Sequence, residues 1–154
     1  MAMSSLELKI PPPVVAVLAA VAMWRIALAV PSSTPPSFHI VLAVVLAVVG
    51  VACAVSGAVA FRRAKTTTNP MDPQAATSLV VTGIYRVTRN PMYVGLCVVL
   101  VAWAAFLWSA WALLGPLVFV GYIARFQIAP EEKALAALFG GEYSAYKAKV
   151  RPWL

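Results

Sequence analysis

Four long apolar runs, separated by polar stretches, set what this chain can fold into. The runs cover residues 14–30, 40–61, 92–108 and 110–128. A helix needs about 20 largely apolar residues to cross a bilayer, so each run is close to the length of one transmembrane helix. Only 11% of the residues are charged, whereas a soluble domain carries about 25%. We therefore expect an all-α integral membrane bundle of four transmembrane helices with a C-terminal cytoplasmic helical segment, in which residues 1–154 form a single domain.

The runs divide this domain into an anchoring half, residues 1–61, and a half that carries the polar motifs, residues 62–154. The third and fourth runs meet at Ser109 and predict a tight hairpin. That hairpin brings the polar segment before the third run to the same side of the membrane as the segment after the fourth. Prolines 70 and 73 exclude a continuous helix from the first segment, and we expect an ordered loop there.

The fourth run and the segment after it contain several predicted breaks. We expect Pro116 to kink the fourth span. A new helix is expected to begin at Glu131 and Glu132 after Pro130, and to end at Gly140, because glycine tolerates the left-handed cap. A last short helix should hold Tyr143 and Tyr146.

Charge distribution predicts the orientation. Basic residues are concentrated in the segment between the second and third runs and in the C-terminal segment, whereas the two opposite turns hold none. Since lysine and arginine mark the cytoplasmic side, we expect a multi-pass protein of the inner or plasma membrane with both termini in the cytoplasm. The net charge of +7 comes without a basic stripe of interleaved aromatics, so no nucleic-acid partner is predicted. One histidine and two cysteines inside apolar runs predict no metal site.

Residues at the two cytoplasmic edges of the hairpin form a candidate site. Helix capping explains Asn90 and Pro91, but it does not explain Tyr93 and Gly95 one turn further on. Glu131 and Glu132 can offset a helix dipole, or they can bind a cation. Each of these residues has an ordinary structural explanation, and only their combination favours a binding site.

Two segments also carry a family resemblance. They read Gly83-Ile84-Tyr85-Arg86-x-x-Arg89-Asn90-Pro91-Met92-Tyr93-x-Gly95 and Pro130-Glu131-Glu132-x-x-Leu135-x-x-x-Phe139-Gly140-x-x-Tyr143-x-x-Tyr146-x-x-x-Val150-Arg151-x-Trp153. As a pair, these motifs resemble the isoprenylcysteine carboxyl methyltransferase family and its prokaryotic relatives among the integral-membrane phospholipid methyltransferases. The resemblance covers Thr66 to Trp153. It departs from the pattern at Ile84, where proline is common, and at Asn90, where many members have histidine; an asparagine cannot transfer a proton.

The resemblance implies an enzyme that uses S-adenosylmethionine and a lipophilic or lipid substrate that enters from the bilayer. It implies catalytic roles for Arg89 and Glu132. The implied cofactor-binding residues are Tyr85, Asn90, Tyr93, Gly95, Glu131, Glu132, Tyr143 and Tyr146. The cofactor's ammonium would suit Glu131 or Glu132, and Arg89 could hold a substrate carboxylate or phosphate.

Three alternatives remain open. The acceptor could be a carboxyl group of the isoprenylcysteine kind or a phospholipid amine, which the sequence does not separate. The chain could also be a non-catalytic four-helix scaffold that binds a partner or anionic lipid. A transporter is disfavoured, because no acidic residue falls inside any of the four runs.

Overall fold

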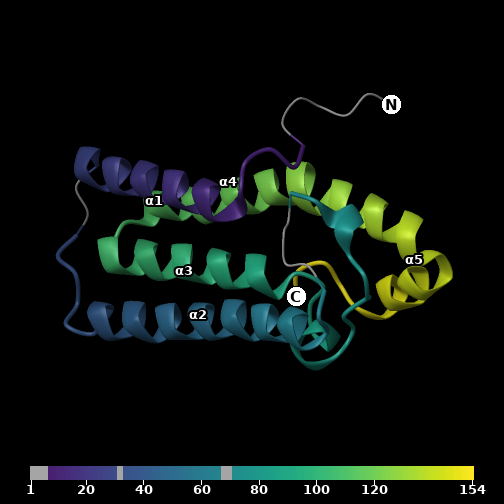
Figure 1. Ribbon diagram of the computed structural model, residues 1–154. Coiled ribbons are helices and arrows are strands. Elements are labelled where there is room, and N and C mark those ends of the chain that lie inside the picture. The colour runs from purple at the N-terminus through teal and green to yellow at the C-terminus, as the bar shows by residue number, and fades with distance from the viewer. Residues whose placement is uncertain (1–6, 31–32, 67–70) are drawn as a thin grey trace.

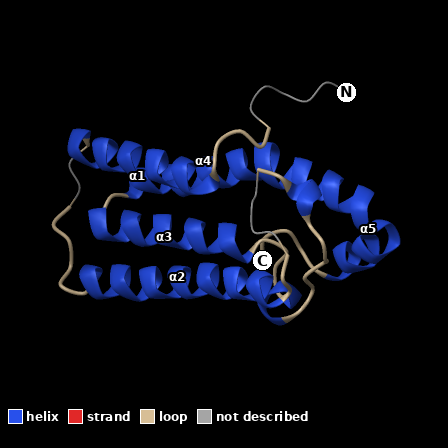
Figure 2. Cartoon of the chain, in the orientation of Figure 1, coloured by secondary structure: helices blue, strands red, loops and turns tan. Residues whose placement is uncertain are grey.

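The computed structural model describes residues 7–30, 33–66 and 71–154, and these residues form helices joined by loops, with no strand among them (Figures 1 and 2). The five α-helices are α1 (Pro12–Ala29), α2 (His39–Arg63), α3 (Pro91–Leu107), α4 (Leu114–Ile123) and α5 (Ala129–Lys149). Three short 3₁₀ turns, η1 (Pro73–Ala75), η2 (Gly83–Arg86) and η3 (Ala110–Leu113), and one π-helix, η4 (Ala124–Ile128), complete the described elements. Residues 31–32 between the first two runs, and residues 67–70 of the expected ordered loop, lie outside the described residues.

Helices α1 to α4 lie side by side as one bundle, as Figure 1 shows. The closest pair is α2 and α3, and glycines allow it: a Cβ built on Gly95 would lie 2.5 Å from the carbonyl oxygen of Gly50 and 2.7 Å from Cβ of Ala54. Such small-residue contacts let two backbones approach each other in a membrane.

Enlarging Gly95 should therefore break this contact. We expect Gly95→Leu to destabilise the protein by about 3 kcal/mol, because no rotamer clears a backbone atom at that distance and α2 must move away from α3. Gly121→Leu is the matched control, since a Cβ on Gly121 meets nothing within 4 Å. Thermal unfolding in detergent measures both variants, and an equal effect of the two would contradict the packing role of Gly95.

Helix α1 packs against α3 and α4 through a second set of contacts. The indole Nε1 of Trp103 donates to the carbonyl oxygen of Ala20 at 3.0 Å. Met23 is fully buried and lies where a side chain on Gly115 would stand. Around these contacts Phe119 and Ile123 form the centre of the core.

The surface of the bundle is apolar as well. Val17, Val48 and Leu117 are each more than 60% exposed. By length and composition, α1, α2 and the continuous helix over 110–149 can each cross a membrane, and α3 is a shorter apolar helix of 17 residues. The prediction of an all-α membrane bundle is confirmed. The count of four spans is approximate, because α3 is short and the fourth apolar run continues into a polar helix.

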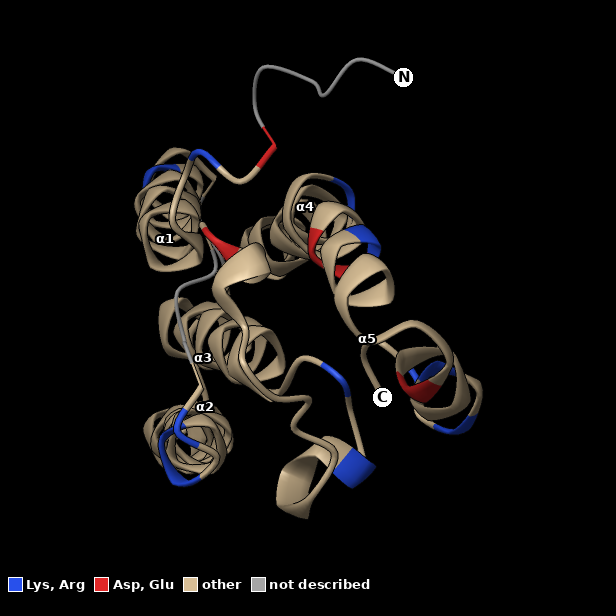
Figure 3. Cartoon of the chain, turned by 45° about the vertical axis from the view of Figure 1, so that its right-hand side comes forward, with Lys and Arg blue, Asp and Glu red and all other residues tan. Residues whose placement is uncertain are grey.

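The two ends of the bundle differ in charge. The connection before α2 and the α3–η3 turn lie at one end, and the segment between α2 and α3, helix α5 and the C-terminus gather at the other (Figure 1). Figure 3 turns this second end toward the viewer and shows acidic and basic residues together there. The sequence carries no Asp, Glu, Lys or Arg between Arg25 and Arg62 or between Arg89 and Arg125. The two polar segments thus meet at one end, as expected.

Two predictions about the fourth span are wrong. Pro116 lies in the first turn of α4, where a missing N–H costs no hydrogen bond, and so it needs no kink. No separate helix begins at Glu131: the chain passes from α4 through the π-helix η4 into α5 without a break. The predicted break at Gly140 is confirmed: with φ 50° and ψ −118°, Gly140 divides α5 into two helical parts, and the second part holds Tyr143 and Tyr146.

Pro130 explains the π-helix. Proline has no N–H for the carbonyl of Phe126 four residues earlier, and its ring crowds that carbonyl. The chain inserts one wider turn, in which the N–H of Ala129 bonds the carbonyl of Ala124 five residues back. The Phe126 oxygen instead accepts the backbone N–H of Leu8 at 3.1 Å, and Arg125 pairs with Glu7 at 3.2 Å. Proline therefore changes the register of the helix without ending it.

Candidate functional site

Arg89 ties the loop before α3 to α5 and to the C-terminal tail, residues 150–154. Its Nη2 lies 2.5 Å from Oε1 of Glu132, and its Nη1 donates to the carbonyl oxygens of Val150 and Lys147, the latter at 3.2 Å. Its backbone N–H bonds the carbonyl oxygen of Arg151 at 3.0 Å. The Arg89 side chain is only 8% exposed. The two residues predicted to be catalytic thus meet, and their ion pair joins segments that are far apart in sequence.

Glu132 is held by cations on both of its oxygens. Oε1 faces Arg89, and Oε2 accepts Nζ of Lys147 at 2.6 Å. Burial disfavours the ionised carboxyl, but the hydrogen bonds and charges of Lys147 and Arg89 outweigh burial and hold the pKa of Glu132 below its usual value. A cationic ligand would have to displace one of these partners. Glu132 is therefore part of the ion-paired framework of the site.

Glu131 has the opposite environment. Its Oε1 accepts two uncharged donors, the hydroxyl of Tyr93 at 2.5 Å and Nε2 of Gln127 at 2.7 Å. Its Oε2 has no hydrogen-bond partner among the described residues and is not among the fully buried polar atoms. The pKa of Glu131 is raised to about 7, mainly by burial and also by the charge of Glu132, while the hydrogen bonds from Gln127 and Tyr93 oppose this rise. Glu131 therefore offers one free carboxylate oxygen without a cation of its own.

The raised pKa of Glu131 has a consequence for stability. Between about pH 4.5 and 7 the folded protein keeps a proton that the unfolded chain releases, so this group's contribution to stability falls as the pH rises through that range. We expect the melting temperature in detergent to drop further between pH 5 and pH 8 in the wild type than in Glu131→Gln. Equal drops in the two proteins would show that the carboxyl titrates normally.

Asn90 fixes the C-terminal tail from a second side. It occupies the position before α3, but its side chain makes no capping bond to that helix. Its Nδ2 donates instead to the carbonyl oxygen of Pro152 at 2.8 Å, and the hydroxyl of Thr88 donates to the same oxygen at 3.2 Å. Simple helix capping therefore does not account for Asn90.

Three tyrosines lie around the two glutamates. Tyr146 donates its hydroxyl to the carbonyl oxygen of Tyr85 at 2.7 Å, and its ring meets that of Tyr143 edge-on at 6.4 Å. Tyr85 and Tyr143 are both buried. Gly95, in contrast, lies against Gly50 and Ala54 of α2, away from the glutamates. The structure thus brings the predicted site residues together except Gly95, whose contacts are those of helix packing.

A small cavity lies between these residues. Its volume is about 60 Å³, and its lining includes Arg89, Asn90, Glu131, Glu132 and the three tyrosines. Ligand pockets usually measure roughly 300–1,000 Å³, so this cavity is closed down around the glutamates. The loop from Ala76 to Val80 forms part of its wall, and Ser78 anchors that loop to the carbonyl oxygen of Ala64 at 3.2 Å. A ligand of ordinary size would require this loop to open.

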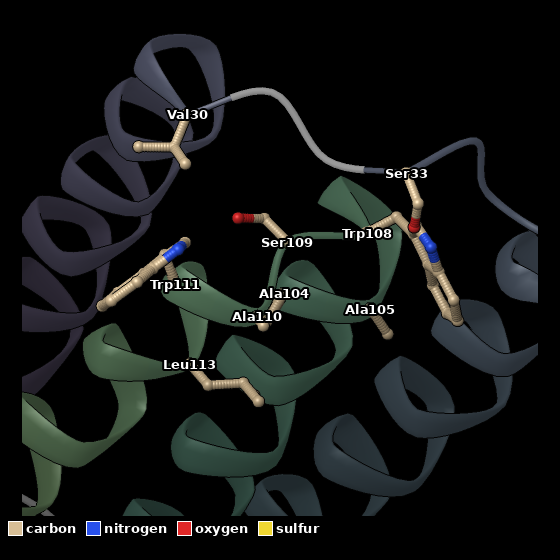
Figure 4. A pocket seen from close by; sticks show the side chains of 9 residues that line it. All are labelled: Val30, Ser33, Ala104, Ala105, Trp108, Ser109, Ala110, Trp111 and Leu113. Atoms are coloured by element: carbon tan, nitrogen blue, oxygen red, sulfur yellow. The ribbon is translucent and has the colours of Figure 1, made fainter.

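A larger hollow of about 560 Å³ lies at the other end of the bundle (Figure 4). Its lining includes Trp108 and Trp111, and Ser109 at the turn between α3 and η3. The Ser109 hydroxyl is buried and has no hydrogen-bond partner among the described residues. None of the predicted site residues lines this hollow, so the candidate site remains at the charged end.

Sequence reasoning missed Gln127 and the tail carbonyls. Gln127 is 2% exposed and is the one side-chain amide in the apolar run over 110–128. Its position four residues before Glu131, on the same helical face, is the signal that could have revealed it. No sequence signal marks the carbonyl groups of Lys147, Val150 and Pro152, because every residue has a backbone carbonyl.

The fold and the site together define a helical membrane protein whose polar site lies where an apolar bundle meets its charged end. The chain belongs to the phospholipid methyltransferase family, whose model matches residues 38–142, more than half of the chain. That family includes the isoprenylcysteine carboxyl methyltransferase type, so the resemblance seen in the sequence is confirmed. An uncharacterised protein of Haemophilus influenzae is 48% identical over 63 residues, which cover 41% of this chain and 100% of the relative. No solved structure matches.

Proposed function

We propose that the protein transfers a methyl group from S-adenosylmethionine to a lipophilic acceptor at the membrane surface. The observation that carries this proposal is the free Oε2 of Glu131 in a cavity walled by tyrosines, beside the Arg89–Glu132 ion pair. When bound, S-adenosylmethionine supplies an electrophilic methyl group on a sulfonium and carries an ammonium and a carboxylate. A carboxylate without its own cation suits a cationic ligand. The chemistry of the residues fits, and the closed cavity requires the loop of Ala76–Val80 to open.

Within this proposal each residue has a distinct role. Glu131 binds the cationic part of the cofactor through Oε2, while Tyr93 and Gln127 hold Oε1. Arg89 and Glu132 hold the loop before α3 against α5, and an anionic acceptor group that binds Arg89 would share it with Glu132. Displacement at a methyl carbon depends on alignment, which can contribute roughly 7–11 kcal/mol. The chain's main contribution is therefore to orient the two reactants and to exclude water.

The membrane face supports a lipophilic acceptor. A groove of about 680 Å³ runs between α1 and α2 over α3, and its lining is almost wholly apolar, including Ala16, Ala43 and Leu100. A hydrocarbon chain fits such a lining without leaving a polar group unpaired. The proposed acceptor is a carboxylate oxygen, as in isoprenylcysteine-like substrates. The second candidate is the amine nitrogen of a phospholipid, which is supported by the family to which the chain belongs.

The test is calorimetric titration of the purified protein in detergent with S-adenosylhomocysteine, followed by methyl transfer from labelled S-adenosylmethionine. The acceptor panel should contain an S-prenylated cysteine and phosphatidylethanolamine. Saturable binding together with transfer to one acceptor supports the proposal and selects the acceptor class. An absence of binding in folded protein would favour a non-catalytic scaffold.

A further inference from the structure

The π-helix η4 places one polar side chain inside an otherwise apolar part of the bundle. Gln127 is 2% exposed, and it comes from the wide turn that Pro130 imposes. π-Helical turns occur frequently at functional sites, where they rotate a side chain out of the regular register. Here the rotated side chain reaches Glu131, with 2.7 Å between Nε2 and Oε1.

The turn is held in place from outside. The Phe126 carbonyl oxygen, which Pro130 cannot bond, accepts the N–H of Leu8, and Glu7 pairs with Arg125 at 3.2 Å. The Glu7 side chain is only 7% exposed. The N-terminal segment therefore supplies a hydrogen-bond donor to the Phe126 carbonyl and a carboxylate to Arg125, two groups of the π-helix. A helix fixed in this way holds Gln127 in a defined position.

From this geometry we infer that Gln127 is a positioning residue that favours the ionised form of Glu131 and leaves its second carboxylate oxygen open to the ligand. This inference rests on the proposed function of Glu131. With Tyr93 and Gln127 both on Oε1, Oε2 remains as the oxygen open to a cation. A hydrogen bond to the ionised form of an acid favours ionisation. The Gln127 amide therefore stabilises the Glu131 carboxylate in part, as the neighbouring cations stabilise the Glu132 carboxylate.

Other charged and titratable groups also face Glu131 and must be held constant. Tyr93 comes from α3, Tyr85 from η2, and Glu132 and Tyr143 from α5, while Arg89 lines the same cavity from the loop before α3. All of these side chains remain when Gln127 is replaced, but Tyr93 also has a hydrogen bond with Gln127. A change in the titration of Glu131 in such a variant is therefore assigned to the lost amide together with its contact to Tyr93.

The experiment is an infrared titration of the purified full-length protein in detergent. The signal of Glu131 is the protonated-carboxyl band that disappears in Glu131→Gln. In Gln127→Met, which keeps the length and loses the donor, we expect the midpoint of this band to rise by about one pH unit. Gln127→Asn is the second variant, because it keeps a buried amide but shortens the side chain by one methylene, and the midpoint should move in the same direction.

Gly121→Ala, which adds a methyl group where nothing lies within 4 Å, serves as the control and should leave the midpoint unchanged. A midpoint that stays at the wild-type value in folded Gln127→Met or Gln127→Asn overturns the inference. The titration needs no substrate. Failure of methyl transfer would thus count against the proposed function, whereas an unmoved midpoint counts against the role of Gln127. If transfer occurs, the acid limb of its pH profile should shift with the same midpoint.

Discussion

Replacing Arg89 by methionine will lower methyl transfer by at least about 100-fold and will loosen the C-terminal tail. Methionine keeps the apolar part of the side chain but removes the contacts to Glu132, Val150 and Lys147. Removing one partner of a buried ion pair costs about 3–5 kcal/mol, and we expect a value of about 3 because Lys147 remains on Glu132. The measurements are the melting temperature in detergent, the rate of transfer, and hydrogen exchange at residues 150–153.

Arg86→Met is the matched control for this variant. Arg86 is an exposed arginine in η2, three residues earlier in the same segment, and takes no part in the salt bridges among the described residues. It should keep the wild-type melting temperature and tail protection. Wild-type stability and activity in Arg89→Met would contradict the account of the site. A loss of membrane insertion in both variants would also contradict it, because both would then act on folding in general.

Replacing Glu131 by glutamine is expected to give the second large effect, a fall in kcat/KM of at least about 100-fold without loss of stability. Glutamine keeps the shape and can still accept the hydroxyl of Tyr93, but it cannot bear the charge that the cationic ligand requires. At pH 8 the variant should melt no lower than the wild type, because it removes a buried carboxylate whose ionisation is unfavourable. Kinetics and unfolding are measured on the same preparation.

Glu142→Gln tests whether this effect depends on position. Glu142 lies on the same helix α5, is exposed, and is not among the residues that line the cavity of the candidate site. It should retain wild-type kinetics. If Glu142→Gln and Glu131→Gln lower the rate equally, the effect arises from the net charge of the protein.

The apolar runs predicted the helices well because length and hydropathy decide which segments cross a membrane. The run over 92–108 became α3 over Pro91–Leu107, and the run over 40–61 became α2 over His39–Arg63. The meeting of Arg89 with Glu132 also followed from the sequence, since a hairpin must return the chain to the side from which it started. For the helix positions and for the Arg89–Glu132 contact, the local sequence pattern and the membrane topology led to the same prediction.

Other features could not be read from the sequence. The local rule predicts a new helix after Pro130, because it takes no account of the Leu8 N–H, which donates to the carbonyl oxygen that Pro130 leaves unbonded. A glycine permits close approach but does not say what approaches, and at Gly95 it is helix α2. The sequence does not divide the roles of Glu131 and Glu132, because only the positions of Lys147 and Gln127 separate them.

The central claim is that the free oxygen of Glu131 binds a positive charge at the edge of the membrane. The most direct measurement is the affinity for S-adenosylhomocysteine at pH 8, because this ligand carries the ammonium that Glu131 is proposed to bind. We expect Glu131→Gln to bind it more weakly than the wild type, whereas Glu142→Gln keeps the wild-type affinity. Wild-type affinity in folded Glu131→Gln would contradict the account.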